Sequence, residues 1–362
     1  MWGKNLFLYL IKIILILLIY FFINIENIFF INFHYNSWAN NKMINNDNLS
    51  GGILNVYIMF SLIWSGQDIL PHNIEALKNF RLKFLDIPFN HFISPKYFVK
   101  EHSLFYNLLM SLIKDKDNQG VFLAPWKSVL DKALVEFKEY ASFIGTKVLI
   151  PPLNIKQDYG LDVAINLYNQ DELYKLIDFS LLTLKNNGFI NVNSSMVSGW
   201  LADAKILEIL SQKNIKYDCS AIPLHIVYSH IKNYRLMDLL KEIWPDIDIF
   251  SLPYKIRFNN KEIIENVQNG GIIEYFSEDE ILNLFKTYIK YYQMNNQNLN
   301  KYPSLLFQLV LHHSRMYESL KKLEGIIQNI LLISESQEIN IKFISLSDKS
   351  GDYLSSYLST VK

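Results

Sequence analysis

The chain has 362 residues, enough to bury one large α/β core or two smaller ones. Its 35 basic and 35 acidic residues balance, so no broad attraction to nucleic acid is expected. Cys219 is the single cysteine, which excludes an intrachain disulfide and a CxxC metal site.

Residues 1–35 are dominated by the apolar run LFLYLIKIILILLIYFFI, which Lys4 and Lys12 flank or interrupt. Two interpretations remain open, a cleaved signal peptide and an uncleaved membrane anchor. Residues 36–52 are polar and end in Gly-Gly, which predicts a linker. We therefore expect a membrane-anchored protein or one exported to the periplasm or cell envelope, with one folded domain over residues 53–362.

The folded region opens with a predicted βαβ unit. The apolar run 54–63 predicts a buried strand, which stops at Trp64-Ser65-Gly66, where glycine permits a sharp turn. A helix is expected over 73–85 and a second strand over 87–93. Functional side chains of such units lie where the first strand ends, which here means Trp64, Ser65, Gln67 and Asp68.

Helices and strands continue to alternate toward the C-terminus. We expect extended segments over 121–124, 148–150, 189–192, 196–197, 215–219, 305–312 and 341–345. We expect helices over 102–114, 129–140, 171–186, 202–212, 236–244, 279–292 and 316–333. This alternation predicts an α/β fold with a parallel sheet or barrel.

Motifs that bind nucleotides or activate a serine are absent, because the chain has no GxGxxG, GxxxxGK[ST], GxSxG or HExxH. Three places in the chain have histidine or aspartate side chains that could take part in catalysis. His91 is either a pocket residue or a hydrogen-bonded core residue, and Asp218 is either an acid/base group or a turn former. His312 and His313 are neighbours that point to opposite faces of a strand, so a metal there would need ligands from elsewhere.

Trp64, Trp126 and Trp200 each follow a predicted strand directly. In a barrel, this position places all three on one rim, where aromatic faces can stack on the apolar C–H edges of sugar rings. The alternative is that large tryptophan side chains simply plug the mouth of the barrel. Three such residues in equivalent positions favour a carbohydrate-type cleft.

The order of these blocks resembles a divergent branch of the polysaccharide deacetylases, the metal-dependent carbohydrate esterases. The first block is similar to that branch's DWEG…L…N…FR…P…HF…P-x-YF, and here it comprises Trp64-Ser65-Gly66, Leu70, Asn73, Phe80-Arg81, Pro88, His91-Phe92, Pro95 and Tyr97-Phe98. Later blocks are similar to HxHPW, D-x-G-x-DV…Y and FRAGGW…D-x-SA, and here they comprise Pro125-Trp126, Asp158-Tyr159-Gly160, Asp162-Val163, Tyr168, Gly199-Trp200, Asp218 and Ser220-Ala221.

This resemblance implies a distorted (β/α)7-8 barrel in which a divalent metal such as zinc activates water to hydrolyse an N- or O-acetyl group on an envelope sugar. The acidic positions of DWEG are Ile63 and Ser65 in this chain, and the two histidines of HxH align with Phe122 and Ala124. The arginine of FRAGGW aligns with Met196. Carbon-only side chains cannot bind zinc, so we expect no metal site and no resident cofactor.

The leading hypothesis is a polysaccharide deacetylase-like pseudoenzyme that acts on or binds acetylated cell-envelope polysaccharide without ordinary metal-dependent catalysis. Its expected substrate-binding residues are Trp64, Ser65, Trp126 and Trp200. A second hypothesis is an active N/O-deacetylase with a relocated site built from Asp68, His91, Asp218 or His312. A third is a membrane-tethered structural protein. No nucleic-acid partner is expected.

Overall fold

The computed structural model describes residues 54–99, 105–138, 143, 158–231, 233–295, 304–337 and 339–347. All of them belong to the unit that runs from Gly52 to Lys362. The hydrophobic segment expected over 1–35, the linker over 36–52 and the apolar run at 148–150 lie outside the described residues. Within the described ranges, no helix has both the length and the apolar character needed to cross a membrane.

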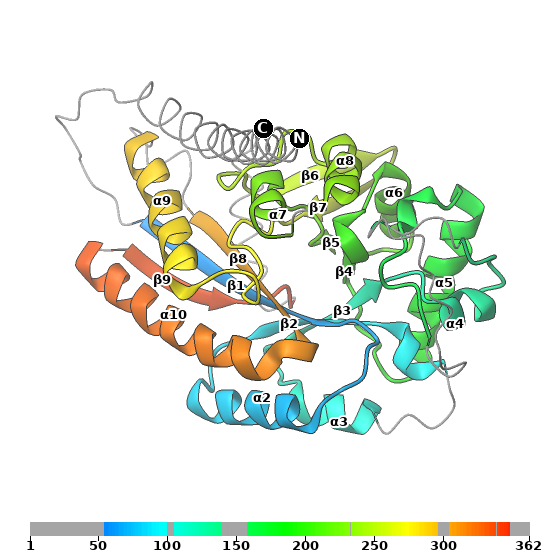
Figure 1. Ribbon diagram of the computed structural model, residues 1–362, viewed down its shortest axis with the longest axis horizontal. Coiled ribbons are helices and arrows are strands. Elements are labelled where there is room, and N and C mark those ends of the chain that lie inside the picture. The colour runs from blue at the N-terminus through cyan, green and yellow to red at the C-terminus, as the bar shows by residue number, and fades with distance from the viewer. Residues whose placement is uncertain are drawn as a thin grey trace, which may run out of the picture. The chain divides into compact units, whose positions relative to one another are not determined.

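The described strands form one sheet of nine strands (Figure 1). They are β1 (Leu54–Trp64), β2 (Phe89–Ile93), β3 (Asn118–Leu123), β4 (Ser194–Val197), β5 (Tyr217–Asp218), β6 (Tyr254–Phe258), β7 (Lys261–Glu265), β8 (Ser304–His312) and β9 (Ile339–Ile344). Their order is β6-β7-β5-β4-β3-β2-β1-β8, and β9 also pairs with β1. The β6–β7 pair is antiparallel and the other pairs are parallel. The expected α/β class is therefore confirmed.

The sheet curls because the segment after β7 crosses to β8. The backbone N–H of Gly270 donates to the carbonyl of Gln308 at 2.9 Å, and the N–H of Val310 donates to the carbonyl of Gly271 at 3.0 Å. Ile272 and Val310 form an isolated parallel bridge. These bonds link β8 to the chain that leaves β7, so the described sheet is curled into part of a barrel, with a single bridge in place of a further strand.

The described helices are α2 (Pro71–Lys83), α3 (Phe105–Leu112), α4 (Lys127–Lys132), α5 (Gln170–Asn186), α6 (Ala204–Gln212), α7 (Leu224–Ile231), α8 (Tyr234–Ile243), α9 (Glu278–Asn295) and α10 (Met316–Gln337). Helices α2 and α10 lie side by side in Figure 1 and are in contact. Phe80 of α2 meets Phe89 of β2 edge to face, with ring centroids 5.7 Å apart. Phe89 pairs with Phe60 of β1, so this apolar face of the sheet is the one that α2 covers.

The opposite face of the sheet carries buried polar side chains. Gln308 Nε2 donates to Ser61 Oγ at 3.1 Å, and Asn118 Nδ2 donates to Ser194 Oγ at 2.6 Å. All four residues are buried, with an exposure of 3% or less. Burying an amide or hydroxyl group costs free energy unless the group is hydrogen-bonded. These polar residues are therefore tolerated on this face of the sheet because they are partners of one another.

The predicted βαβ unit is confirmed, because β1 and β2 are parallel neighbours joined through α2. The helix expected over 129–140 was wrong in length, since α4 ends at Lys132 and Leu134 adopts a φ of 57° that breaks the helix. The extended segment expected over 189–192 was also wrong, because the strand is β4 instead.

Among the described α-helices and strands, three have no counterpart in the sequence prediction, namely α7 and the two strands of the β6–β7 hairpin. The hairpin turns at Asn259, whose φ is 48°. Asparagine tolerates this left-handed conformation better than other residues with a side chain, which suits it to a tight hairpin turn.

Candidate functional site

The carboxyl ends of β1, β2 and β3 are tied together at the rim of the sheet. The N–H of Ser94 donates to the carbonyl of Trp64 at 2.8 Å, and the indole Nε1 of Trp126 donates to the carbonyl of Ser65 at 2.8 Å. Gly66 has a φ of 96°, and a Cβ there would lie 2.9 Å from Nε1 of Trp126. The turn predicted after β1 is therefore confirmed, and only glycine fits it.

Trp64 and Trp126 are buried beneath this rim. Trp64 has no exposed surface, and its ring stacks on His313 with centroids 5.7 Å apart and meets Phe105 of α3 edge to face. Trp126 is 4% exposed, and the ammonium of Lys96 lies over its ring at 3.5 Å from the centroid. Neither ring presents a free face to a sugar in this structure. Both fill space between the strand ends and the helices, as the plug interpretation described.

Trp200 differs from the other two because it remains partly exposed. It follows Gly199 at the end of β4, and both residues have positive φ values, 63° and 60°. Such a backbone is strained for a bulky side chain and persists only where the surroundings hold it. Here the indole Nε1 donates to Gln268 Oε1 at 2.9 Å, while the carbonyl accepts from Trp244 Nε1 at 2.8 Å. Hydrogen bonds thus hold Trp200 at its indole nitrogen and at its backbone carbonyl, while part of its surface stays accessible.

His91 belongs to a buried network on the helix-covered face. Its Nδ1 accepts from Trp64 Nε1 at 3.0 Å, and its Nε2 lies 3.2 Å from Asp117 Oδ2. Asp117 also forms a 2.5 Å ion pair with Arg81 of α2. Burial lowers the pKa of His91, which keeps the imidazole neutral. Of the two interpretations of His91, the geometry matches the hydrogen-bonded core residue.

Asp218 is fully buried between β4 and β7. It accepts hydrogen bonds from Ser195 Oγ at 2.6 Å and from the N–H of Ser220 at 2.9 Å. Glu265 lies beside it and accepts from the N–H of Ser220 at 3.0 Å and of Ala221 at 2.7 Å. Burial raises the pKa of Asp218, and burial together with the charge of Asp218 raises the pKa of Glu265 well above its usual range. Both carboxyls are therefore poor candidates for contact with an external ligand.

His312 ends β8, and its Nδ1 lies 2.7 Å from Ser314 Oγ. Burial lowers the pKa of His312 to about 3, so it is neutral near pH 7. Its backbone N–H donates to Glu274 Oε1, and burial raises the pKa of Glu274 to about 7. The other oxygen of Glu274 has no hydrogen-bond partner among the described residues.

Glu274 was not among the predicted site residues, although the apolar pair Ile272-Ile273 before it signals burial. Asp68 lies on the exposed turn after β1. In the described structure no hydrogen bond or ion pair joins Asp68, His91, Asp218 and His312. The structure thus places the four acid/base candidates in separate surroundings.

Three of the four positions at which the sequence resemblance expects acidic or histidine side chains carry hydrocarbon instead, and the fourth is Ser65. Ile63 is partly buried at the end of β1, while Phe122 and Ala124 are 4% and 2% exposed at the end of β3. None has an atom that can coordinate a cation. Across the described ranges, no group of three or more His, Cys, Asp or Glu side chains could hold a metal ion. The side chains present therefore do not fit the divalent metal that the resemblance implies.

No protein-family model matches this chain, and no curated protein matches it at a significant level. Among solved structures, the chain is similar to a "putative polysaccharide deacetylase" from Mycobacterium smegmatis. The two share 8% sequence identity and a TM-score of 0.51, over 86% of this chain and 94% of that chain. It is also similar to a 4-alpha-glucanotransferase from Thermococcus litoralis, with 11% identity, a TM-score of 0.42, and coverage of 83% of this chain and 38% of that chain. At 8% identity, the first likeness shows a shared fold and nothing about activity.

Proposed function

We propose that this protein is a polysaccharide deacetylase-like domain that binds acetylated cell-envelope glycan without ordinary metal-dependent catalysis. The observation that carries the proposal is the chemistry at the strand ends, where Ile63, Phe122 and Ala124 stand at positions that the sequence resemblance assigns to metal ligands. A deacetylase of this kind needs a Lewis acid to polarise the acetyl carbonyl and to lower the pKa of water. The shared fold supports a glycan ligand by analogy. The side chains of Ile63, Phe122 and Ala124 argue against the metal-dependent hydrolysis that the resemblance implies.

Trp200 is the residue we assign to glycan contact at the rim. Its ring is partly exposed and held by hydrogen bonds to Gln268 and Trp244, so a sugar would bind a preorganised aromatic surface. Ser65 lies next to this rim, and its buried Oγ has no hydrogen-bond partner among the described residues. Trp64 and Trp126 support the rim from beneath.

We further propose that the apolar run within residues 1–35 exports the domain or anchors it in a membrane, which would place the domain next to its glycan. A reporter domain fused after residue 52 tests this step. Recovery of the reporter in the membrane or envelope fraction is expected, and recovery in the cytoplasm would contradict it. Removal of residues 1–35 is the control and should return the reporter to the cytoplasm.

Calorimetric titration of the full-length protein with N-acetylated chitin oligomers and peptidoglycan fragments tests glycan binding. The Trp200→Ala variant should weaken binding about fivefold, because an aromatic contact contributes on the order of 1 kcal/mol. Tyr234→Ala is the matched control, since Tyr234 is an aromatic residue of α8 with 72% exposure. Binding that is unchanged in Trp200→Ala would refute the assignment. The absence of binding to any glycan would refute the proposal and favour a membrane-tethered structural protein.

One observation favours the second candidate, a deacetylase with a relocated site. Glu274 has a pKa near 7 and a carboxylate oxygen without a partner among the described residues, which are properties of a general acid or base. Acetate release from acetylated oligomers in the presence of a chelator, lost in Glu274→Gln, would support this candidate. Release that persists in Glu274→Gln would exclude Glu274 from such a site.

A further inference from the structure

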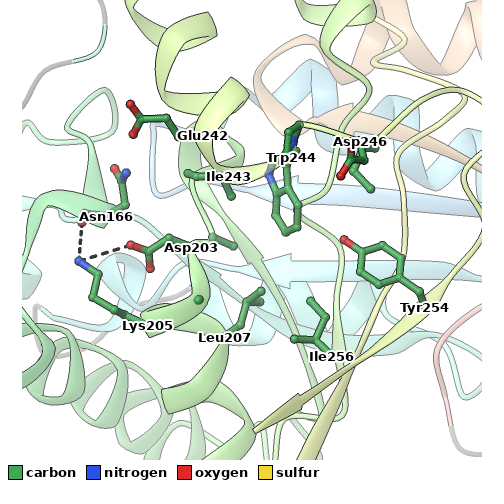
Figure 2. Close-up of a pocket in the computed structure, with 14 residues that line it drawn as sticks. Asn166, Asp203, Lys205, Leu207, Glu242, Ile243, Trp244, Asp246, Tyr254 and Ile256 are labelled. Atoms are coloured by element: carbon green, nitrogen blue, oxygen red, sulfur yellow. Dashed lines mark hydrogen bonds and ion pairs between the residues drawn. The ribbon is translucent and has the colours of Figure 1, made fainter.

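A cleft of about 720 Å³ lies beside Trp200, between the start of α6, the end of α8 and strand β6 (Figure 2). Its apolar floor includes Ala202, Leu207 and Ile256. Trp244 lines it and donates its indole N–H to the carbonyl of Trp200, so the cleft adjoins the rim at that residue. A concave apolar site with a few polar groups is the usual form of a ligand pocket.

The cleft is negatively charged. Asp203, Glu242 and Asp246 line it, and Lys205 is the cation among its lining residues. Lys205 Nζ lies 3.3 Å from Asp203 Oδ2 and donates to the carbonyls of Asn166 at 2.9 Å and of Tyr168 at 3.2 Å. Two backbone carbonyls and one carboxylate therefore surround the ammonium of Lys205, as the dashed lines of Figure 2 show in part.

No described residue compensates the charge of Glu242 or of Asp246. Both are exposed on either side of Trp244, and neither has an ion-pair or hydrogen-bond partner among the described residues. Two unpaired carboxylates above an apolar floor attract a ligand that carries positive charge and also has apolar surface.

Tyr254 supplies the aromatic surface of the cleft. In Figure 2 its hydroxyl points toward the space between Trp244 and Asp246. No described residue is a hydrogen-bond partner of this hydroxyl. Burial raises the pKa of Tyr254, so the phenol remains neutral and can donate a hydrogen bond. The cleft thus offers a ring face, a hydroxyl donor and two free carboxylates.

We propose that this cleft binds a glycan that carries free amino groups, an inference that rests on the proposed glycan-binding function. The ammonium groups of such a chain would pair with Glu242 and Asp246, while the apolar face of a sugar ring would pack on Tyr254. An acetylated sugar has no charge to pair with these carboxylates. The cleft therefore favours deacetylated segments of a polymer whose acetylated segments contact Trp200.

Calorimetry in mildly acidic buffer compares a β-1,4-linked glucosamine hexamer with the N-acetylglucosamine hexamer. The glucosamine hexamer is expected to bind about tenfold more tightly, since two partly exposed ion pairs contribute roughly that factor. The double variant Glu242→Gln, Asp246→Asn should abolish the preference while leaving the acetylated hexamer unaffected. Asp238→Asn is the matched control, because Asp238 is an exposed carboxylate of α8 outside the cleft.

Equal affinity for the two hexamers, or a preference that survives the double variant, would overturn the inference and leave the proposed function intact. Failure of both hexamers to bind would refute this inference and the proposed glycan-binding function together. A hexalysine peptide serves as a further probe. Binding of that peptide as tightly as the glucosamine hexamer would show a general cation site and would also overturn the inference.

Discussion

The indole N–H of Trp244 donates a 2.8 Å hydrogen bond to the backbone carbonyl of Trp200, across 44 positions of sequence. The bond connects the end of α8 to the end of β4, where Trp200 has a positive φ. It therefore couples the orientation of the rim tryptophan to one wall of the acidic cleft. A change at either residue should affect both the fold of this loop and the recognition of a glycan.

Gly199→Ala tests whether the loop conformation matters. Gly199 has a φ of 63°, and an added Cβ would lie 2.8 Å from Cε1 of Phe143. We expect a loss of about 1–3 kcal/mol in the free energy of unfolding, measured with urea, because alanine is strained there. Glycan affinity should fall together with stability. An unchanged unfolding midpoint would contradict the positive φ at this position.

Asp117→Ala should strongly destabilise the domain. The change removes the partner of buried Arg81 and of His91, and breaking a buried ion pair costs about 3–5 kcal/mol. Asp131→Ala is the control, since Asp131 pairs with Lys127 on the exposed surface of α4 and should cost no more than about 0.5 kcal/mol. Similar losses for the two variants would show that the Arg81–Asp117–His91 network is not buried as described.

Glu274 should make stability fall as the pH rises. Burial raises its pKa from 4.5 to about 7, so between these values the folded state holds a proton that the unfolded state has released. Glu274→Gln removes this pH-dependent contribution to the free energy of unfolding. The stability of the variant relative to the wild type should therefore rise by about 1–3 kcal/mol from pH 4 to pH 8. Denaturant unfolding at several pH values measures the gain.

Glu280→Gln is the matched control for that series. The backbone N–H of Ser277 lowers the pKa of Glu280, so its carboxylate stabilises the fold at higher pH and this contribution is lost as the pH falls. The control should therefore change the pH dependence in the opposite direction. A Glu274→Gln variant whose pH profile parallels the wild type would contradict the raised pKa of Glu274.

The sequence predicts much of the sheet because its strands are continuous apolar runs. The run over β1 is readable without structure, since a short apolar stretch rich in β-branched and aromatic residues is typical of a strand buried on both faces. The β6–β7 hairpin is not readable in this way, because the residues of β6 are only partly buried or exposed. Its strands therefore have no strong apolar pattern to mark them.

The site is harder to predict because local sequence does not decide which way a side chain turns. Trp64, Trp126 and Trp200 all follow strands, yet Trp64 packs against α3 and Trp126 folds over the end of β1. Of the three, Trp200 alone is partly exposed and the other two are buried. Contacts between residues distant in the chain make this difference, as they do for Glu242 and Tyr254 in the cleft.

The most direct test of a glycan-binding domain without a metal centre is a titration of the full-length protein with an N-acetylated chitin oligomer, once with a chelator and once with added zinc. Acetate is assayed in both samples afterwards. We expect the same affinity in the two samples and no acetate above the level without protein. Binding that requires zinc, or acetate that appears only with zinc, would contradict the account.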